Sequence, residues 1–122
     1  MFMITAVIKP AELIPVRSEL VAAGITGMTV SECSGHGRGA RMVPGLRGGP
    51  DVPYLEDNLQ IEVAVANDAM APALDAIRRG AALGERGKIF VSSIERVVSI
   101  RTGLEDELAL NAPGHVWFEA AE

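Results

Sequence analysis

Apolar residues recur at every second position near the start of the chain, which is the periodicity of a half-buried β-strand. In residues 2–9 the even-numbered positions from Phe2 to Ile8 fall on one face, and Pro10 ends the segment. The opposite face, which includes Val7, is also largely apolar. We therefore expect a strand that needs a cover on both faces.

The next two segments complete a strand–helix–strand unit. Residues 11–23 place four apolar residues from Leu13 to Val21 on one helical stripe, and Gly24 follows at the predicted helix end. Residues 27–34 predict a second strand.

A second unit of the same kind follows later in the chain. Residues 59–66 alternate like a strand, and the apolar stripe of residues 70–81 predicts a helix that Asn67 or Asp68 caps. Residues 88–93 predict the fourth strand. Two such units in tandem predict a ferredoxin-like α+β sandwich, in which two helices cover one face of a four-stranded antiparallel sheet. The bare sheet face predicts self-association into a closed homo-oligomer.

Two segments fall outside this pattern. Residues 34–53 contain nine Gly or Pro in twenty positions, so they predict a long loop that is either functional or a plain flexible insertion. Residues 94–100 either extend the fourth strand or turn back on it, and residues 104–110 predict a short helix.

Composition and charge limit the kinds of binding partner and the cellular location that we expect. The net charge of -5 argues against binding to nucleic acid, and the whole acidic excess lies in residues 104–122. The single cysteine, Cys33, cannot form an internal disulfide, and no segment predicts a secretion signal or a membrane span. We expect a cytoplasmic protein.

The candidate chemistry consists of glycines beside basic residues. Gly35, Gly37 and Arg38 lie where a strand enters the long loop, Gly87 and Lys88 precede another strand, and Arg101 follows the last one. Glycine lets backbone N–H groups approach an anion, and Arg or Lys neutralises phosphate. Each motif alone is also compatible with ordinary turns and solvated charges, because the sequence has no Walker A or GxGxxG pattern.

Six motifs in order make the chain resemble the PII signal-transduction family of small trimeric nucleotide sensors over residues 3–103. They are IKP at 8–10, GITGMTVSE at 24–32, GHGR at 35–38, QIEVAVAND at 60–68, GKIFV at 87–91 and SIRTG at 99–103. The resemblance implies a PII-like domain over residues 1–103, a T-loop at about residues 36–58 between the second and third strands, and an acidic C-terminal extension over residues 104–122.

The resemblance also implies a homotrimer that binds ATP, ADP or AMP between subunits. From the residues of this chain we expect no catalytic residues, no catalytic cofactor and no metal site. Carried over by position, the adenine contacts are Val7, Gly27, Met28, Thr29 and Ala64. The T-loop base contributes Gly35, Gly37 and Arg38, and the phosphate contacts are Gly87, Lys88 and Arg101.

Several family features are absent. Gly39 stands where sensors of 2-oxoglutarate have a glutamine, Asn58 where they have a lysine, and Asp51 where the modified tyrosine falls, while Tyr54 is out of register. The phosphate loop reads Glu85-Arg86-Gly87-Lys88, and Ser99 replaces one of two arginines. These differences favour a divergent, carboxysome- or transporter-associated regulator that responds to bicarbonate through Arg38, Arg41 or Arg47.

Three other functions remain open at the level of the sequence. A nitrogen-regulatory PII protein that senses ATP and 2-oxoglutarate is the main alternative. A small nucleotide hydrolase needs a general base, for which Glu62 is the candidate. A metal-tolerance trimer of the CutA type is disfavoured by the Arg and Gly motifs.

Overall fold

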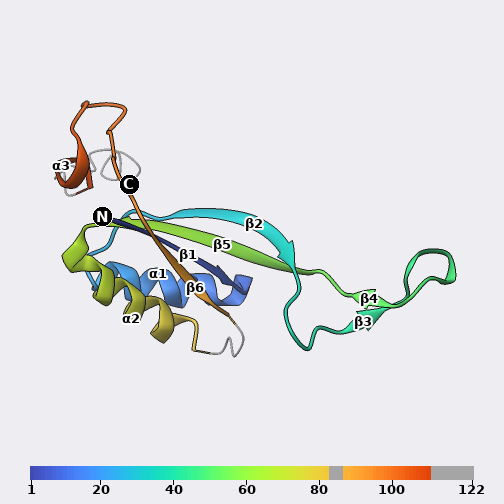
Figure 1. Cartoon of the computed structure of the whole chain (residues 1–122). Coiled ribbons are helices and arrows are strands. Elements are labelled where there is room, and N and C mark those ends of the chain that lie inside the picture. The colour runs from blue at the N-terminus through green and yellow to red at the C-terminus, as the bar shows by residue number, and fades with distance from the viewer. Residues whose placement is uncertain (83–86, 111–122) are drawn as a thin grey trace.

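The computed structural model describes residues 1–82 and 87–110 and has two layers, a sheet and a pair of helices (Figure 1). The sheet is antiparallel, with the strand order β2-β5-β1-β6. Both long helices lie on the same side of it (Figure 1). This arrangement confirms the predicted ferredoxin-like α+β sandwich. The elements are β1 (Phe2–Ile8), α1 (Leu13–Ala22), β2 (Thr29–Gly35), β5 (Glu56–Val65), α2 (Met70–Gly80) and β6 (Ile89–Ser93).

The core lies between the sheet and the helices and is aliphatic. Strand β1 buries Ile4, Ala6 and Ile8, and the register with β5 places Ile4 opposite Val63 and Ala6 opposite Ile61. The helices complete the core with Val16, Leu20, Ala73, Ala76 and Ile77. The period-two pattern of the strands therefore decides which sheet face the helices cover.

Gly80 allows the two helices to cross closely. A Cβ atom built on Gly80 would lie 2.5 Å from the Cα of Val16, which is closer than side-chain atoms approach backbone. The helix pair therefore depends on a residue without a side chain at this position.

The predicted side-chain cap of the second helix is wrong. A 3₁₀ turn, η3 (Asn67–Ala69), precedes α2, so Ala69 occupies the cap position and no side chain caps the helix. The side-chain oxygen of Asn67 instead accepts a hydrogen bond from the amino group of Met1. A similar turn, η1 (Pro10–Glu12), precedes α1.

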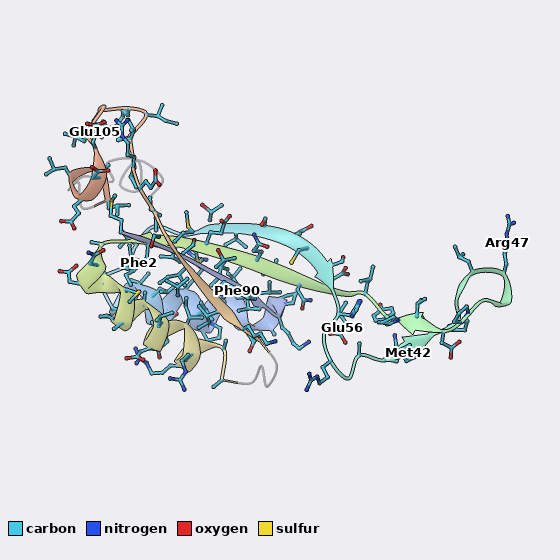
Figure 2. The ribbon with its side chains drawn as sticks, viewed as in Figure 1. Phe2, Met42, Arg47, Glu56, Phe90 and Glu105 are labelled. Carbon is cyan, nitrogen blue, oxygen red and sulfur yellow. The ribbon has the colours of Figure 1, made fainter. Side chains whose placement is uncertain are left out.

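The T-loop contains a short hairpin that the sequence did not predict. Strands β3 (Met42–Val43) and β4 (Val52–Pro53) pair with each other, and the turn η2 (Leu46–Gly48) lies between them. The hairpin projects away from the sheet, with Arg47 near its tip (Figure 2). Strand β5 begins at Glu56, so the loop ends earlier than the predicted boundary at residue 58. Two-residue strands are too short to show a period of two within a Gly- and Pro-rich sequence.

The chain beyond β6 leaves the sheet and turns back on itself. We call residues 94–110 the C-terminal arm; it projects away from the layer of α1 and α2 (Figure 1). Val98 forms an isolated bridge with Glu105, and the short helix α3 (Asp106–Leu110) ends the described part. The predicted features at Glu85, Arg86 and residues 111–122 lie outside the described residues.

Candidate functional site

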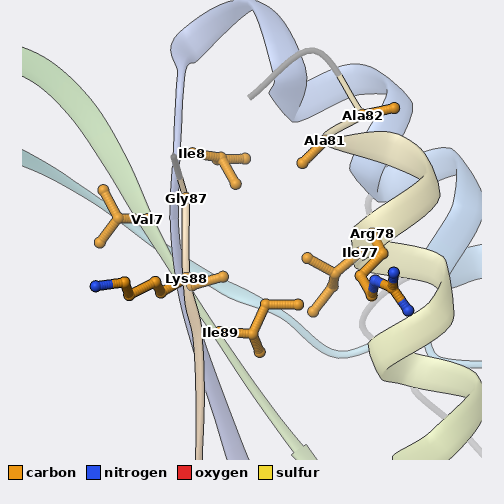
Figure 3. A pocket seen from close by; sticks show the side chains of 10 residues that line it. Val7, Ile8, Ile77, Arg78, Ala81, Ala82, Gly87, Lys88 and Ile89 are labelled. Atoms are coloured by element: carbon orange, nitrogen blue, oxygen red, sulfur yellow. The ribbon is translucent and has the colours of Figure 1, made fainter. Parts of the chain in front are cut away.

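One group of predicted ligand residues gathers where β1 ends and β6 begins. Val7, Gly87 and Lys88 line a cavity of about 210 Å³ there. A Cβ atom on Gly87 would lie 3.5 Å from the carbonyl oxygen of Val7, so the two backbones are neighbours. Figure 3 shows the side chains of Val7 and Lys88 pointing away from α2, while Ile77 and Ile89 fill the space on the helix side. The cavity is smaller than the pockets of roughly 300–1,000 Å³ that usually enclose a small molecule.

The base of the T-loop lies at the same end of the sheet. Strands β1 and β2 both run antiparallel to β5, so their carboxyl ends lie at one edge together with the start of β5. Gly35, the last residue of β2, pairs with Glu56, and Gly37 and Arg38 follow it. The first group therefore consists of Val7, Gly35, Gly37, Arg38, Gly87 and Lys88.

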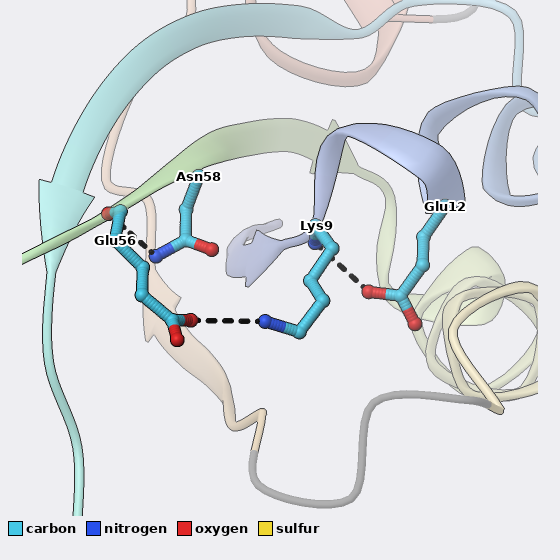
Figure 4. Close-up of polar contacts among 4 residues, drawn as sticks. All are labelled: Lys9, Glu12, Glu56 and Asn58. Carbon is cyan, nitrogen blue, oxygen red and sulfur yellow. Dashed lines mark hydrogen bonds and ion pairs between the residues drawn. The ribbon is translucent and has the colours of Figure 1, made fainter. Parts of the chain in front are cut away.

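Contacts around Glu56 join the T-loop base to the end of β1. Lys9 Nζ lies 3.1 Å from Glu56 Oε2, and Asn58 Nδ2 donates to the carbonyl oxygen of Glu56 at 3.3 Å (Figure 4). Both side chains of the ion pair are about half exposed, so its contribution to stability is small. Its position matters more, because it links β1 to the start of the T-loop.

Glu12 is a buried carboxylate whose role sequence reasoning missed. It is 4% exposed, and its Oε1 accepts a hydrogen bond of 2.8 Å from the backbone N–H of Lys9 (Figure 4). Its Oε2 is buried and has no hydrogen-bond partner among the described residues. Glu12 is three residues after Lys9, the cap residue of η1, and an acid at this spacing is a capping-box signal that could have identified the contact.

A second group of predicted residues lies at the opposite end of the sheet. Gly27, Met28 and Thr29 are at the start of β2, and Ala64 is near the end of β5, opposite Met3. Thr29 and Gly35 are six residues apart along one strand, or about 20 Å at the usual rise per residue. Arg101 lies beyond the end of β6, in the C-terminal arm. The second group therefore consists of Gly27, Met28, Thr29, Ala64 and Arg101.

Val7 of the first group and Ala64 of the second are too far apart to contact one purine ring within one chain. Val7 and Ala64 were both predicted to contact adenine, and both lie on the sheet face that the helices leave open. Ala64 pairs with Met3, which is four residues from Val7, so about 13 Å separates them along the strands. A single purine ring reaches both only if they belong to different subunits.

The three arginines predicted to bind an effector anion do not come together. Arg38 is at the base of the T-loop, whereas the Arg41 guanidinium lies 4.4 Å from the centroid of the Tyr54 ring, farther along the loop. Arg47 is in the turn η2 at the far end of the hairpin, with a positive φ of 53° (Figure 2). A small anion therefore cannot contact all three in this conformation of one chain.

The candidate general base of the hydrolase hypothesis lies in mid-strand. Glu62 pairs with Thr5 on one side and with Thr29 on the other. No group of three or more His, Cys, Asp or Glu residues that could hold a metal ion occurs within residues 1–82 and 87–110. In the same ranges, no helix has the length and the apolar character needed to cross a membrane.

Comparison with known proteins decides the family. The family model described as "Nitrogen regulatory protein P-II" matches residues 1–104. The chain belongs to the P-II family. It is 38% identical to the nitrogen regulatory protein GlnK of Escherichia coli over 112 residues, which cover 90% of this chain and 100% of that protein. It is 44% identical to a nitrogen regulatory protein P-II of Mesorhizobium japonicum over 102 residues, which cover 82% of this chain and 91% of that one.

Membership of the P-II family establishes the general kind of activity. Proteins of this family are trimeric signal-transduction regulators that bind nucleotides and target proteins, and they are not enzymes. This confirms that the chain is a regulator rather than a hydrolase. These relatives are named nitrogen regulatory proteins, so the comparisons favour nitrogen regulation over the predicted carboxysome association.

Proposed function

We propose that three copies of this chain bind adenine nucleotides at sites shared between neighbouring subunits, and that the bound nucleotide controls the docking of the T-loop on a target protein. The observation that carries the proposal is the separation of about 13 Å along the strands between Val7 and Ala64, two residues predicted to contact the same adenine ring. A closed ring of identical subunits brings one end of each subunit against the other end of the next.

The two groups supply complementary chemistry. The first group offers backbone N–H groups at its three glycines, which can approach phosphate closely, and the cation of Lys88. The second group offers Met28 and Ala64 as apolar contacts for adenine, and Arg101 as a further cation. Nucleotide bound by both groups therefore depends on the contact between subunits.

The uncovered sheet face and the arm fit this assembly. Phe90 is 60% exposed on the side of the sheet away from the helices, and Val7 is 37% exposed on the same face. Ile100, next to Arg101 in the arm, is fully exposed. Burial of apolar surface favours association, and a trimer covers the face that the two helices leave open.

A small monovalent anion, with bicarbonate as the specific proposal, fits the T-loop base better than 2-oxoglutarate. Gly39 has no side chain to hold a metal, and Asn58 supplies an amide that already donates to the carbonyl oxygen of Glu56. The ammonium group of Lys9 pairs with Glu56. A dicarboxylate therefore lacks a free fixed cation at these three positions. Arg38 is the candidate anion ligand, and a membrane transporter or a carboxysome-related protein is the proposed target.

Nitrogen regulation through ATP and 2-oxoglutarate is the second candidate function. The observation that favours it is the similarity of the chain to nitrogen regulatory proteins over nearly their full length. It requires that residues other than Gly39 and Asn58 complete a keto-acid site.

Calorimetry tests the nucleotide site and the effector in one series. We expect ADP or AMP to bind with a dissociation constant in the micromolar range, which corresponds to about -8 kcal/mol. Bicarbonate at matched pH and ionic strength should change this affinity, and 2-oxoglutarate with Mg-ATP should not, because linked sites alter each other reciprocally. No heat with any adenine nucleotide would overturn the proposal, and tighter nucleotide binding with 2-oxoglutarate would favour the second candidate.

A further inference from the structure

The C-terminal arm presents Arg101 in a turn that is closed by its own hydrogen bonds. The backbone N–H of Ser99 donates to the carbonyl oxygen of Leu104 at 2.8 Å, and that of Gly103 donates to Ser99 at 2.9 Å. The hydroxyl oxygen of Thr102 accepts from the backbone N–H of Leu104 at 3.2 Å. These contacts give the backbone around Arg101 a defined conformation.

Two acidic residues close the base of the same turn. Asp106 Oδ1 accepts a hydrogen bond of 3.1 Å from the backbone N–H of Val97, and the N–H of Asp106 donates to the carbonyl oxygen of Val97 at 2.8 Å. Next to this reciprocal pair, Glu105 forms an ion pair with Arg96. The whole segment from residue 96 to residue 106 is thereby held as a loop whose ends meet.

Apolar burial does not hold the arm in one chain. Val98 is 54% exposed, Leu104 is 38% exposed, and Ile100 is fully exposed. The arm is therefore held closed mainly by the polar contacts at its base. Asp106 also has a positive φ of 56°, a conformation that Asp adopts more readily than most residues other than glycine.

We propose that Asp106, assisted by Glu105, is a positioning residue that holds the arm closed and so presents Arg101 to the nucleotide site of the neighbouring subunit. This inference rests on the proposed function. Asp106 does not itself contact the ligand; it acts through the conformation of the turn that carries Arg101. The family resemblance assigned no role to either acidic residue, since both lie in the predicted acidic extension.

The test begins with three single variants of the chain. Asp106→Ala removes the side-chain acceptor, Asp106→Asn retains the Oδ1 acceptor and tolerates a positive φ, and Glu107→Ala changes an exposed neighbour as the control. Hydrogen exchange at the amides of Val97 and Ser99 reports the closure of the arm without any ligand. Calorimetry with ADP reports the presentation of Arg101.

For Asp106→Ala we expect faster exchange at Val97 and Ser99 and an ADP affinity lower by about tenfold, the scale for loss of one charged hydrogen bond. Asp106→Asn and Glu107→Ala should resemble the wild-type chain in both measurements. In an Arg101→Ala background, Asp106→Ala should weaken ADP binding no further, because both changes remove the same contact.

Each contrary outcome identifies its cause. Unchanged amide exchange in Asp106→Ala, or faster exchange with unchanged ADP affinity, overturns the positioning role. Additive losses in the double variant also overturn it, because Asp106 would then act independently of Arg101. Absence of ADP binding by the wild-type chain contradicts the proposed function instead, and the exchange measurement still decides whether Asp106 closes the arm.

Discussion

At the scale of single residues, the buried carboxylate of Glu12 fixes the point where β1 ends. Its only hydrogen bond among the described residues comes from the backbone N–H of Lys9, whose side chain reaches Glu56 at the T-loop base. The polar contacts of three residues thereby connect the first strand to the loop that we propose for target recognition. None of these contacts follows from the hydrophobic pattern.

Replacement of Glu12 by alanine should therefore destabilise the fold. We expect Glu12→Ala to lower the free energy of unfolding by about 1–3 kcal/mol, because it removes the charged acceptor of the partly buried N–H of Lys9. Urea denaturation measures the change. Glu107→Ala removes an exposed acid from the arm and should lower stability by less than about 0.5 kcal/mol. Equal stability of the two variants would contradict the role assigned to Glu12.

At the scale of elements, Gly80 determines how closely α1 and α2 pack. A methyl group at this position would overlap the backbone of Val16, so one helix must move. We expect Gly80→Ala to reduce the free energy of unfolding by roughly 1–3 kcal/mol, despite the higher helix propensity of alanine. A suitable control is Gly27→Ala, because a Cβ atom there meets nothing within 4 Å. Unchanged or increased stability of Gly80→Ala would show that the helices adapt without cost.

Next to the pairing of β3 with β4, one ring contact and one further backbone hydrogen bond join the two sides of the T-loop hairpin. Arg41 lies over the ring of Tyr54, and the N–H of Tyr54 donates to the carbonyl oxygen of Arg41 at 2.6 Å. An exposed contact of a cation with an aromatic ring contributes about 0.5–1 kcal/mol. We therefore expect Tyr54→Ala to speed hydrogen exchange at the amides of Val43 and Val52 by roughly two- to fivefold.

Tyr54→Phe serves as the matched variant for this contact. It keeps the aromatic ring beneath Arg41 and should leave the exchange rates at Val43 and Val52 close to those of the wild-type chain. Equal acceleration in Tyr54→Phe and Tyr54→Ala would show that the hydroxyl group, and not the ring, holds the hairpin.

The sequence predicted the elements that bury a regular apolar face, and missed those held by local polar contacts. The alternation in β1 and β5 and the stripe of α2 gave the strands, the helix and the two-layer fold. The 3₁₀ turn before α2 displaced the expected cap, because Asn67 bonds to Met1 instead. The β3–β4 hairpin and the closed turn of the arm depend on contacts between residues that carry no periodic signal.

The residues of the predicted site also divide into those that a sequence pattern reveals and those whose placement depends on the folded structure. Gly35, Gly37, Gly87 and Lys88 could be chosen from the sequence because glycine beside a cation is a recognisable motif, and the structure places them at one end of the sheet. Their distance from Ala64 and Arg101 could not be predicted without the strand register. The contacts of two acids, Glu12 and Asp106, were not predicted, because their hydrogen-bond partners are backbone groups.

At the scale of the whole molecule, each proposed nucleotide site draws on two subunits. The cavity beside Val7 and Lys88 is too small to enclose a nucleotide, and Arg101 lies in an arm beyond the far end of the sheet. The exposed apolar residues of the open sheet face and of the arm need a cover that one chain does not provide. We expect light scattering to give a mass close to three times 12.9 kDa, and a monomer at micromolar concentration would contradict the assembly.

Complementation between two variants that each bind ADP weakly is the most direct test of a site shared between subunits. Lys88→Ala removes one of the two cations of the first group, and Arg101→Ala removes the cation of the second, so each homo-oligomer should bind ADP about ten- to hundredfold more weakly than the wild-type chain. Co-expression of the two variants produces mixed trimers, whose composition native mass spectrometry can verify. With random mixing in a closed ring, about one quarter of the sites combine an intact Lys88 with an intact Arg101. We predict that this quarter of the sites binds ADP with wild-type affinity. When the two variants are assembled separately and then mixed without subunit exchange, no high-affinity ADP sites should appear. Verified mixed trimers that recover no high-affinity sites would contradict the account.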